Sequence, residues 1–411
     1  MNQEKIDIAI IGAGPSGAVA GAMLCRLGYS VVVIEKQHFP RFSIGESLLP
    51  QCMAFLQQAG LDEIVYQHAS DLAFQHKNGA AFHKNGVDTH FDFRQKFSDG
   101  PGTTFQVKRA DFDKLLADGA SNAGVDIRYG QLVDDVDVAG DKPTLTITDE
   151  NGDCYQLNAK FLLDASGFAR VLPRLLDLEK PSDFPERQSF FTHVKDNISD
   201  TGFDRDKILI TVHPQCSDIW FWLIPFSDGT ASIGVVGESK QFDGALSSEQ
   251  ILKKAIAETP NLKALLENAH WHMPVNTLKG YSADVQQLTG KNYALLGNAG
   301  EFLDPVFSSG VTIAMCSASI IAPVIHRHLQ GETVNFFQEF EQPLRKGVDC
   351  FKTFVKAWYD GGFQDVIFYP KQEPAVREMI SSILAGYAWD EANPYVAQSE
   401  RRFKVLVDLC Q

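Results

Sequence analysis

The sequence predicts an α/β fold: a doubly wound, Rossmann-like domain, an inserted antiparallel β-sheet domain that makes the second lobe α+β, and a helical C-terminal region. Three observations lead to this prediction. Residues 6–11 form an apolar run that leads into glycines with GxGxxG spacing. Short alternating segments between residues 187 and 275 are typical of an antiparallel sheet. From residue 335 the apolar pattern is helical to the end.

The first elements are a strand, a tight turn and a helix, in the sequence IAIIGAGPSGAVAG. Gly12 permits the tight turn, Gly14 lets a pyrophosphate approach the backbone, and Gly17 lets the helix pack on the sheet. The helix that begins at Pro15 and Ser16 has free N–H groups and a dipole that favour a phosphate there. A lone glycine pattern would fit an ordinary turn equally well, so the next strand decides between the two.

That second strand, residues 31–34, ends in Glu35 and is followed by Lys36. The carboxylate of Glu35 is placed to accept hydrogen bonds from both hydroxyls of an adenosine ribose, and it disfavours a 2′-phosphate. Strand, helix, second strand and terminal acid agree, so the sequence predicts a dinucleotide site rather than a simple turn.

The remaining elements follow in order. The pattern predicts a helix at 50–59, a hairpin of 72–76 and 80–84 with its turn at Asn78-Gly79, a strand at 88–93, a helix at 110–122, strands at 125–128, 131–138, 144–148, 155–158 and 161–165, and a last parallel strand at 292–296 before a long helix. Phe351, Phe354, Trp358 and Tyr359 recur at helical spacing and are interpreted as core.

Composition limits the classes of function. A chain of 411 residues with 44% hydrophobic residues can form two lobes, and its net charge of −15 argues against nucleic acid as a partner. Seven cysteines without a CxxC pair favour free thiols in a reducing cytoplasm over disulfides or a metal site. The sequence shows neither a signal peptide nor about 18 uninterrupted apolar residues, so we expect no membrane span.

Five separated motifs resemble the flavin-dependent halogenase and aromatic-hydroxylase group of FAD enzymes, with geranylgeranyl-reductase-type flavoproteins as close relatives. The motifs are GAGPSG with Glu35, FPRFSIGESLLP, FQVKRADFDKLL, DASG and GNAGEFLDPVFSSGV, within residues 1–315. The resemblance implies FAD contacts from Gly12, Gly14, Pro15, Ser16, Gly17, Glu35, Lys36, Arg41, Ser47, Arg109, Asp164, Gly297, Asn298, Asp304, Ser309, Gly310 and Val311.

Several of these residues also allow a purely structural interpretation. Ser47 could cap a helix, and Asp164 could form a turn at the end of a strand. Arg109 heads a helix, where the dipole disfavours a cation, so a bound anion is the better explanation. Asn298 replaces the aspartate usual in the family, and it can still hydrogen-bond a ribityl hydroxyl without charge.

The resemblance also implies a catalytic set of Lys77, Glu46, Ser47, Trp220 and Trp222. Glu46 and Ser47 would lie near the flavin. Lys77 falls where halogenases keep a lysine that receives hypohalous acid, although it could equally be a solvated hairpin corner. IWFWLIP resembles the signature GWxWxIP with Ile219 in place of glycine, and its tryptophans would wall a dry passage to the substrate or simply fill a core.

The resemblance implies an FAD-dependent monooxygenase or halogenase that acts through a flavin C4a-hydroperoxide on an aromatic or conjugated substrate, either free or tethered to a carrier protein. Chloride or bromide would bind near the flavin, and electrons would come from NAD(P)H directly or through a flavin reductase. Two alternatives stay open: a reductase of prenyl or polyene double bonds, and an FAD-bound protein without activity. We expect residues 1–75, 100–180 and 285–330 to bind FAD, residues 76–99 and 181–284 to form the substrate domain, and residues 331–411 to form a helical cap.

Overall fold

The computed structural model describes residues 3–410, and a five-stranded parallel sheet lies at its centre. Its order is β20 (Tyr293–Leu295), β12 (Phe161–Asp164), β2 (Ile8–Ile11), β3 (Val31–Glu35) and β8 (Asp126–Tyr129). All four pairings are parallel, and β2, β3 and β12 are buried along their whole length. Continuous apolar strands of this kind need cover on both faces.

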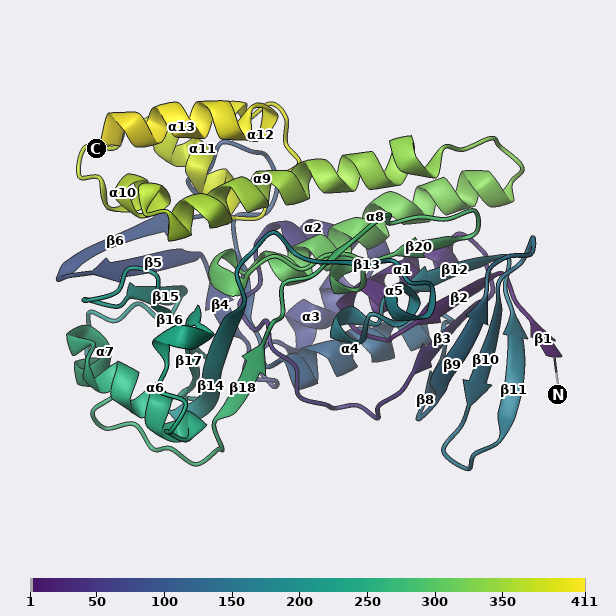
Figure 1. Cartoon of the computed structure of the whole chain (residues 1–411), viewed down its shortest axis with the longest axis horizontal. Helices are drawn as coiled ribbons and strands as arrows, with labels where there is room; N and C mark the ends of the chain where they lie inside the picture. The colour runs from purple at the N-terminus through teal and green to yellow at the C-terminus, as the bar shows by residue number, and fades with distance from the viewer. Residues whose placement is uncertain (1–2, 411) are drawn as a thin grey trace.

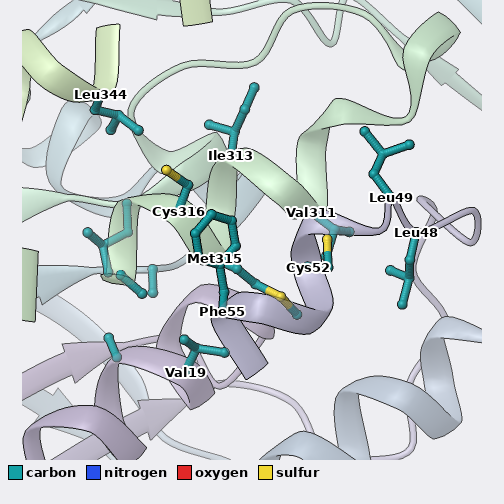
Figure 2. Packing of buried hydrophobic residues seen from close by; sticks show 14 of the residues in the cluster. Val19, Leu48, Leu49, Cys52, Phe55, Val311, Ile313, Met315, Cys316 and Leu344 are labelled. Carbon is teal, nitrogen blue, oxygen red and sulfur yellow. The ribbon is translucent and has the colours of Figure 1, made fainter. Parts of the chain in front are cut away.

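Helices supply part of that cover. α1 (Pro15–Arg26) and α4 (Arg109–Asn122) contact the strands, while α2 (Gln51–Ala59), α3 (Asp62–His68) and α8 (Ser309–Leu329) pack against these two helices. A short helix, α5 (Val171–Leu175), follows β12 along the chain. α1 packs against both α4 and α8, and α2 packs against α8. Figure 2 shows Cys52 and Phe55 of α2 in the same apolar cluster as Val311 and Met315 of α8.

A four-stranded sheet lies at one end of the molecule, and a seven-stranded sheet, the second lobe, lies at the other (Figure 1). The four-stranded sheet consists of β1 (Gln3–Lys5), β11 (Cys154–Asn158), β10 (Thr144–Thr148) and β9 (Leu132–Asp137). Two shorter pairs complete this part of the fold: β13 (Glu179–Lys180) with β19 (Asp284–Val285), and β4 (Gln75–Lys77) with β7 (Thr104–Gln106). β9, β10 and β11 correspond to the strands predicted at 131–138, 144–148 and 155–158, whereas the strand predicted at 125–128 is β8 of the parallel sheet.

The second lobe is a seven-stranded sheet. Its order is β18 (Asn276–Lys279), β14 (Arg187–Lys195), β17 (Thr230–Glu238), β16 (Trp220–Pro225), β15 (Lys207–Val212), β5 (Gly79–Lys84) and β6 (Val87–Asp92). Alternation along β16 divides its side chains: Phe221 and Leu223 join a core under α6 (Ser248–Ala257) and α7 (Pro260–Leu265), whereas Trp220, Trp222 and Ile224 join the main core.

The predicted hairpin around Asn78-Gly79 is wrong. β4 pairs with β7, and β5 pairs with β6 and with β15 instead. A Cβ on Gly79 would lie 2.2 Å from the carbonyl oxygen of Phe91, so this glycine serves a close approach between strands rather than a turn. An Asn-Gly pair is typical of a hairpin turn, but here the glycine is needed for close packing of strands.

The C-terminal helices lie along one side of both lobes (Figure 1). A π-helical turn (Phe337–Glu341) leads into α9 (Gln342–Tyr359), followed by α10 (Gly362–Phe368), α11 (Pro374–Leu384), α12 (Pro394–Ala397) and α13 (Ser399–Cys410). α9 packs beside α8 at one end, and Trp358 at its other end touches Phe82 of the seven-stranded sheet. Phe351, Phe354 and Trp358 are buried, which confirms the core interpretation for those three residues.

Among the described residues, α8 is long and apolar enough to cross a membrane by length and composition. However, 67% of its most apolar stretch is buried inside the fold, against α1, α2 and α9. α8 is therefore the central helix of the core. All seven cysteines are within the described residues and are free.

Candidate active site

A cavity of about 680 Å³ begins where the parallel strands β2, β3 and β12 end and extends to β16 of the second lobe. This is the usual place and size for a ligand site in a doubly wound fold. Of the residues predicted from the sequence, the cavity is lined by Gly12, Gly14, Pro15, Ser16, Glu35, Lys36, Arg41, Glu46, Ser47, Arg109, Trp220, Trp222, Asn298, Gly310 and Val311. The other predicted residues lie behind this lining: Gly17, Lys77, Asp164, Gly297, Asp304 and Ser309.

The glycine turn at one end leaves no room for side chains. A Cβ on Gly17 would lie 1.9 Å from the carbonyl oxygen of Gly12, and a Cβ on Gly12 would lie 2.6 Å from that of Ala165. Gly12 also has a φ of +95°, which other residues rarely adopt. The turn therefore brings the backbone to the cavity and aims the N-terminus of α1 into it, where N–H groups are free to bind a phosphate.

Glu35 holds this turn from the end of β3. Its Oε2 accepts a hydrogen bond from the N–H of Ala13 at 2.9 Å, and its Oε1 accepts one from Gln37 at 2.9 Å. Each carboxylate oxygen keeps a further lone pair. Glu35 can therefore support the turn and still receive two ribose hydroxyls.

The two predicted arginines share one buried carboxylate, which sequence reasoning missed. Arg109 donates to Asp113 from Nε at 2.7 Å and from a terminal nitrogen at 3.0 Å, and Arg41 donates to the same group at 3.0 Å. The anion that balances Arg109 is thus Asp113, one turn along α4, rather than a phosphate alone. The i, i+4 spacing of the two residues was the available signal.

Arg109 also fixes the segment before α2, because it donates to the carbonyl of Ile44 at 2.5 Å. Both arginines still line the cavity beside Gly14 and Gly45. They supply positive charge at the place where a pyrophosphate would lie.

Asp164 and Asp304 act on the backbone. Asp164 is fully buried and accepts from the N–H groups of Ser166 and Leu172, at 2.9 and 2.7 Å. Asp304 accepts from the N–H of Val306 at 3.0 Å and so begins the turn before α8. Burial raises the pKa of both carboxyls, that of Asp304 to about 6. Each holds a cavity loop in place from behind.

The N-terminus of α8 forms a second polar wall. Ser308 has a left-handed φ of 56° and precedes Ser309, the first residue of the helix, while Gly310 lines the cavity. Gly297 bonds back to the helix, since its N–H donates to Ser317 at 3.1 Å. The side-chain oxygen of Asn298, which is buried at the cavity wall, accepts no hydrogen bond from the described residues.

Glu46 pairs with His193, a residue that the sequence did not reveal. The distance from Glu46 Oε1 to His193 Nε2 is 2.7 Å, while Glu46 Oε2 is buried without a partner among the described residues. Burial lowers the pKa of His193, but the hydrogen bond and charge of Glu46 outweigh this and raise it overall. Glu46, which lines the cavity, is therefore held by His193 and keeps one carboxylate oxygen without a partner among the described residues.

Lys77 is fully buried, so the interpretation as a solvated hairpin corner is wrong. Its Nζ donates to Ser47 Oγ at 2.7 Å and to the carbonyl of Leu48 at 2.8 Å. Ser47 lies four residues before the first residue of α2, so it does not cap that helix. Burial lowers the pKa of Lys77 to about 7, against a smaller opposing effect of Cys52. One residue, Ser47, thus separates this lysine from the cavity.

The tryptophans of β16 combine both predicted roles, because they are buried and also line the cavity. Trp222 Nε1 donates to Ser232 at 3.0 Å, and the ring is 6.0 Å from that of Trp220. Gly234 lies opposite Trp222 on β17, and a Cβ there would lie 2.2 Å from the indole. Gly234 makes room for this wall, and nothing in its sequence context indicated that.

The residues present fit FAD. The N-terminus of α1 and two arginines suit its phosphates, Glu35 suits its ribose, and the N-terminus of α8 suits the flavin edge. Unpaired oxygens of Glu46 and Asn298 lack donors among the described residues. Within residues 3–410 no group of three or more His, Cys, Asp or Glu side chains is arranged to hold a metal ion. The fold and the cavity define an FAD-dependent oxidoreductase.

The comparisons with known proteins agree. The FAD binding domain family matches residues 5–332. The chain is 27% identical to the 1H-pyrrole-2-carbonyl-(peptidyl-carrier protein) chlorinase of Pseudomonas fluorescens, over 94% of this chain and 90% of the relative. It is 29% identical to the corresponding brominase of Pseudoalteromonas luteoviolacea, over 94% and 93%. A solved flavoprotein/dehydrogenase from Cytophaga hutchinsonii is 40% identical, with a TM-score of 0.94 over 99% of both chains. The chain belongs to the FAD binding domain family and is an oxidoreductase of the flavin-dependent halogenase type.

Proposed function

We propose that this enzyme halogenates an aromatic or conjugated substrate, with Lys77 as the residue that passes the halogen on. One observation carries the proposal: Lys77 Nζ is hydrogen-bonded to Ser47, which lines the cofactor cavity, although the lysine itself is sealed from solvent. Burying an ammonium without a carboxylate partner is costly even with two hydrogen bonds, which favours a functional role for Lys77. When bound and reduced, FAD would react with O2, and this chemistry would oxidise a halide to hypohalous acid.

The charge state of Lys77 suits this role. A pKa of about 7 leaves roughly half of the amine neutral near pH 7. A neutral amine can exchange one hydrogen for halogen from hypohalous acid, releasing water, and then pass the halogen to an electron-rich carbon. Ser47 and the carbonyl of Leu48 hold the nitrogen in one position while this occurs.

The cavity walls would protect the oxidant. Trp220, Trp222, Ile208 and Ile224 give one side of the cavity an apolar surface that excludes water. Glu46, held by His193, would present its free oxygen to the flavin end. The residues proposed to hold FAD are those predicted from the sequence, with Asp164, Asp304 and Gly17 acting through the backbone.

The carrier-protein-bound pyrrole named for two relatives supports a carrier-tethered substrate here. We also propose that electrons come from NAD(P)H, directly or through a partner flavin reductase, and that the protein works in the cytoplasm. The division into an FAD-binding domain, a β-rich substrate domain and a helical cap belongs to the same proposal.

A direct test supplies the FAD-loaded protein with a flavin reductase, NADH, O2 and bromide. The substrate is a pyrrole-2-carbonyl group, either free or loaded on a peptidyl carrier protein, and mass spectrometry reads the product. We expect bromine on the carrier-bound group, lost in K77M and kept in K84M, which alters a lysine on β5, the next strand along the chain. Absence of bromine from both substrate forms would count against the proposal.

A second candidate function is reduction of a carbon–carbon double bond, favoured by the name flavoprotein/dehydrogenase of the 40% identical structure. This function would need neither O2 nor halide. Anaerobic reoxidation of the reduced, FAD-loaded protein by a prenyl or polyene substrate, with a saturated product, would replace the first proposal by the second.

A further inference from the structure

Tyr359, the last residue of α9, makes polar contacts that its place in an aromatic stripe did not suggest. Its hydroxyl oxygen accepts a hydrogen bond from Trp220 Nε1 at 2.9 Å, and its hydroxyl hydrogen is donated to Asp304 Oδ2 at 2.9 Å. The residue lies in the C-terminal helices, beyond the stretch that the FAD binding domain family matches. The donor and one acceptor site of the hydroxyl are both used.

The ring of Tyr359 is also held in place. The guanidinium carbon of Arg187 lies 3.3 Å from the ring centroid, and Arg187 forms two hydrogen bonds to Asp218 at 2.9 and 2.7 Å. Arg187 is itself buried on β14. A stacked cation fixed by its own ion pair leaves the tyrosine ring little freedom to turn.

The two partners of the hydroxyl belong to different walls of the cavity. Trp220 lines it from β16 of the second lobe. Asp304 begins the turn Pro305–Phe307 on the other side, where Pro305 and Ser308 line the cavity. A single hydroxyl of the C-terminal helices therefore joins the apolar wall to the loop that starts α8.

We propose that Tyr359 is a positioning residue that sets the gap between these two walls and keeps the oxidant passage closed to water. This inference rests on the proposed halogenation for its consequence, although not for its geometry. Without the hydroxyl, the indole of Trp220 and the turn at Asp304 would move independently. FAD would still bind, but more of the oxidant would escape before it reaches Lys77.

The charge on Asp304 should affect Trp220 through the hydroxyl of Tyr359, which is hydrogen-bonded to both residues. Its pKa of about 6 reflects burial first, and the groups around it are Tyr359 and Tyr281, the Arg187–Asp218 pair, and the N–H of Val306. Above pH 6 the carboxylate accepts the tyrosine hydroxyl, and below pH 6 its proton weakens that acceptor. The hydrogen bond from Trp220 to the Tyr359 hydroxyl should therefore weaken as well when Asp304 is protonated.

The first test needs neither FAD nor substrate. The five tryptophans each give one indole N–H signal by NMR, and W220F identifies the signal of Trp220. We expect this signal to titrate near pH 6 in the wild type, and to be shifted and pH-independent in Y359F. D304N should hold it near its low-pH position. An unchanged Trp220 signal in Y359F would overturn the inference, whatever the enzyme's reaction proves to be.

The second test measures coupling, as halogenated product per NADH consumed. Y387F is the control, because Tyr387 is a buried tyrosine of the same helical region whose hydroxyl donates to Pro101 at 2.8 Å, away from the cavity. We expect Y359F to lower coupling about fivefold, as for a lost hydrogen bond, with FAD affinity unchanged and Y387F at the wild-type value. Equal coupling in the two variants would show that Tyr359 is merely structural. A complete absence of halogenation would refute the proposed function and leave the NMR result standing.

Discussion

The nucleotide end and the lysine end of this site are built in opposite ways. At the nucleotide end, Gly12, Gly17 and Glu35 lie within one β-α-β unit and line or support an open cavity. At the other end, Lys77 is sealed, and its contacts come from Ser47 and Leu48, far away in sequence. The nucleotide end is formed by one local stretch of backbone, whereas the lysine end forms only when several segments of the chain pack together.

We expect the largest effect from a substitution in the glycine turn at the nucleotide end of the site. Gly17→Ala would place a Cβ 1.9 Å from the carbonyl oxygen of Gly12, so the turn and helix α1 must separate. We expect FAD affinity to fall at least about 100-fold, because the phosphate cradle is lost. Gly244→Ala is the control, since a Cβ there meets no described atom within 4 Å. Titration of the apoprotein with FAD measures both, and normal binding by Gly17→Ala would refute the cradle.

The next largest effect comes from a substitution at the lysine end that leaves the nucleotide end unchanged. Lys77→Met should abolish halogenated product, a loss of at least about 100-fold as for other essential catalytic groups. FAD affinity should stay within about twofold, because Lys77 lies behind the cavity lining rather than in it. Substantial turnover by Lys77→Met would rule the lysine out.

A third prediction concerns the carboxylate that Arg41 and Arg109 share. Asp113→Asn leaves two arginines without their anion in a buried place, and we expect a loss of about 3 kcal/mol in the free energy of unfolding. Asp118→Asn, on the same helix, breaks the exposed pair with Lys114 and should cost less than about 1 kcal/mol. Denaturant unfolding of the apoprotein compares them, and equal losses would contradict the buried role of Asp113.

The smallest expected effect depends on pH. The pKa of Lys77 is about 7 in the folded protein and near its ordinary 10.5 when unfolded, so the unfolded chain binds more protons between these values. The free energy of unfolding of the wild type, relative to Lys77→Met, should therefore increase as pH rises from 7 to 10. Urea unfolding at pH 7 and pH 9 measures this change, and a difference that is flat or falls would show that burial does not lower the pKa of Lys77.

The same contrast explains what the sequence could reveal. The glycine turn, Glu35 and the flavin loops are local patterns, and the structure brings most of those residues to one cavity. Asn78-Gly79 misled because a glycine needed for close strand packing looks like a turn. His193, Gly234 and Tyr359 were missed because their roles depend on partners from other elements. Asp113 could have been found from its spacing to Arg109.

The most direct test of the account is rapid mixing of the anaerobically reduced, FAD-loaded protein with oxygenated buffer, with and without bromide, while flavin absorbance is followed. We expect an absorbance transient before full reoxidation, and a decay of that transient that bromide accelerates. Direct reoxidation without a transient, at the same rate with and without bromide, would contradict halogenation and favour the reductase function.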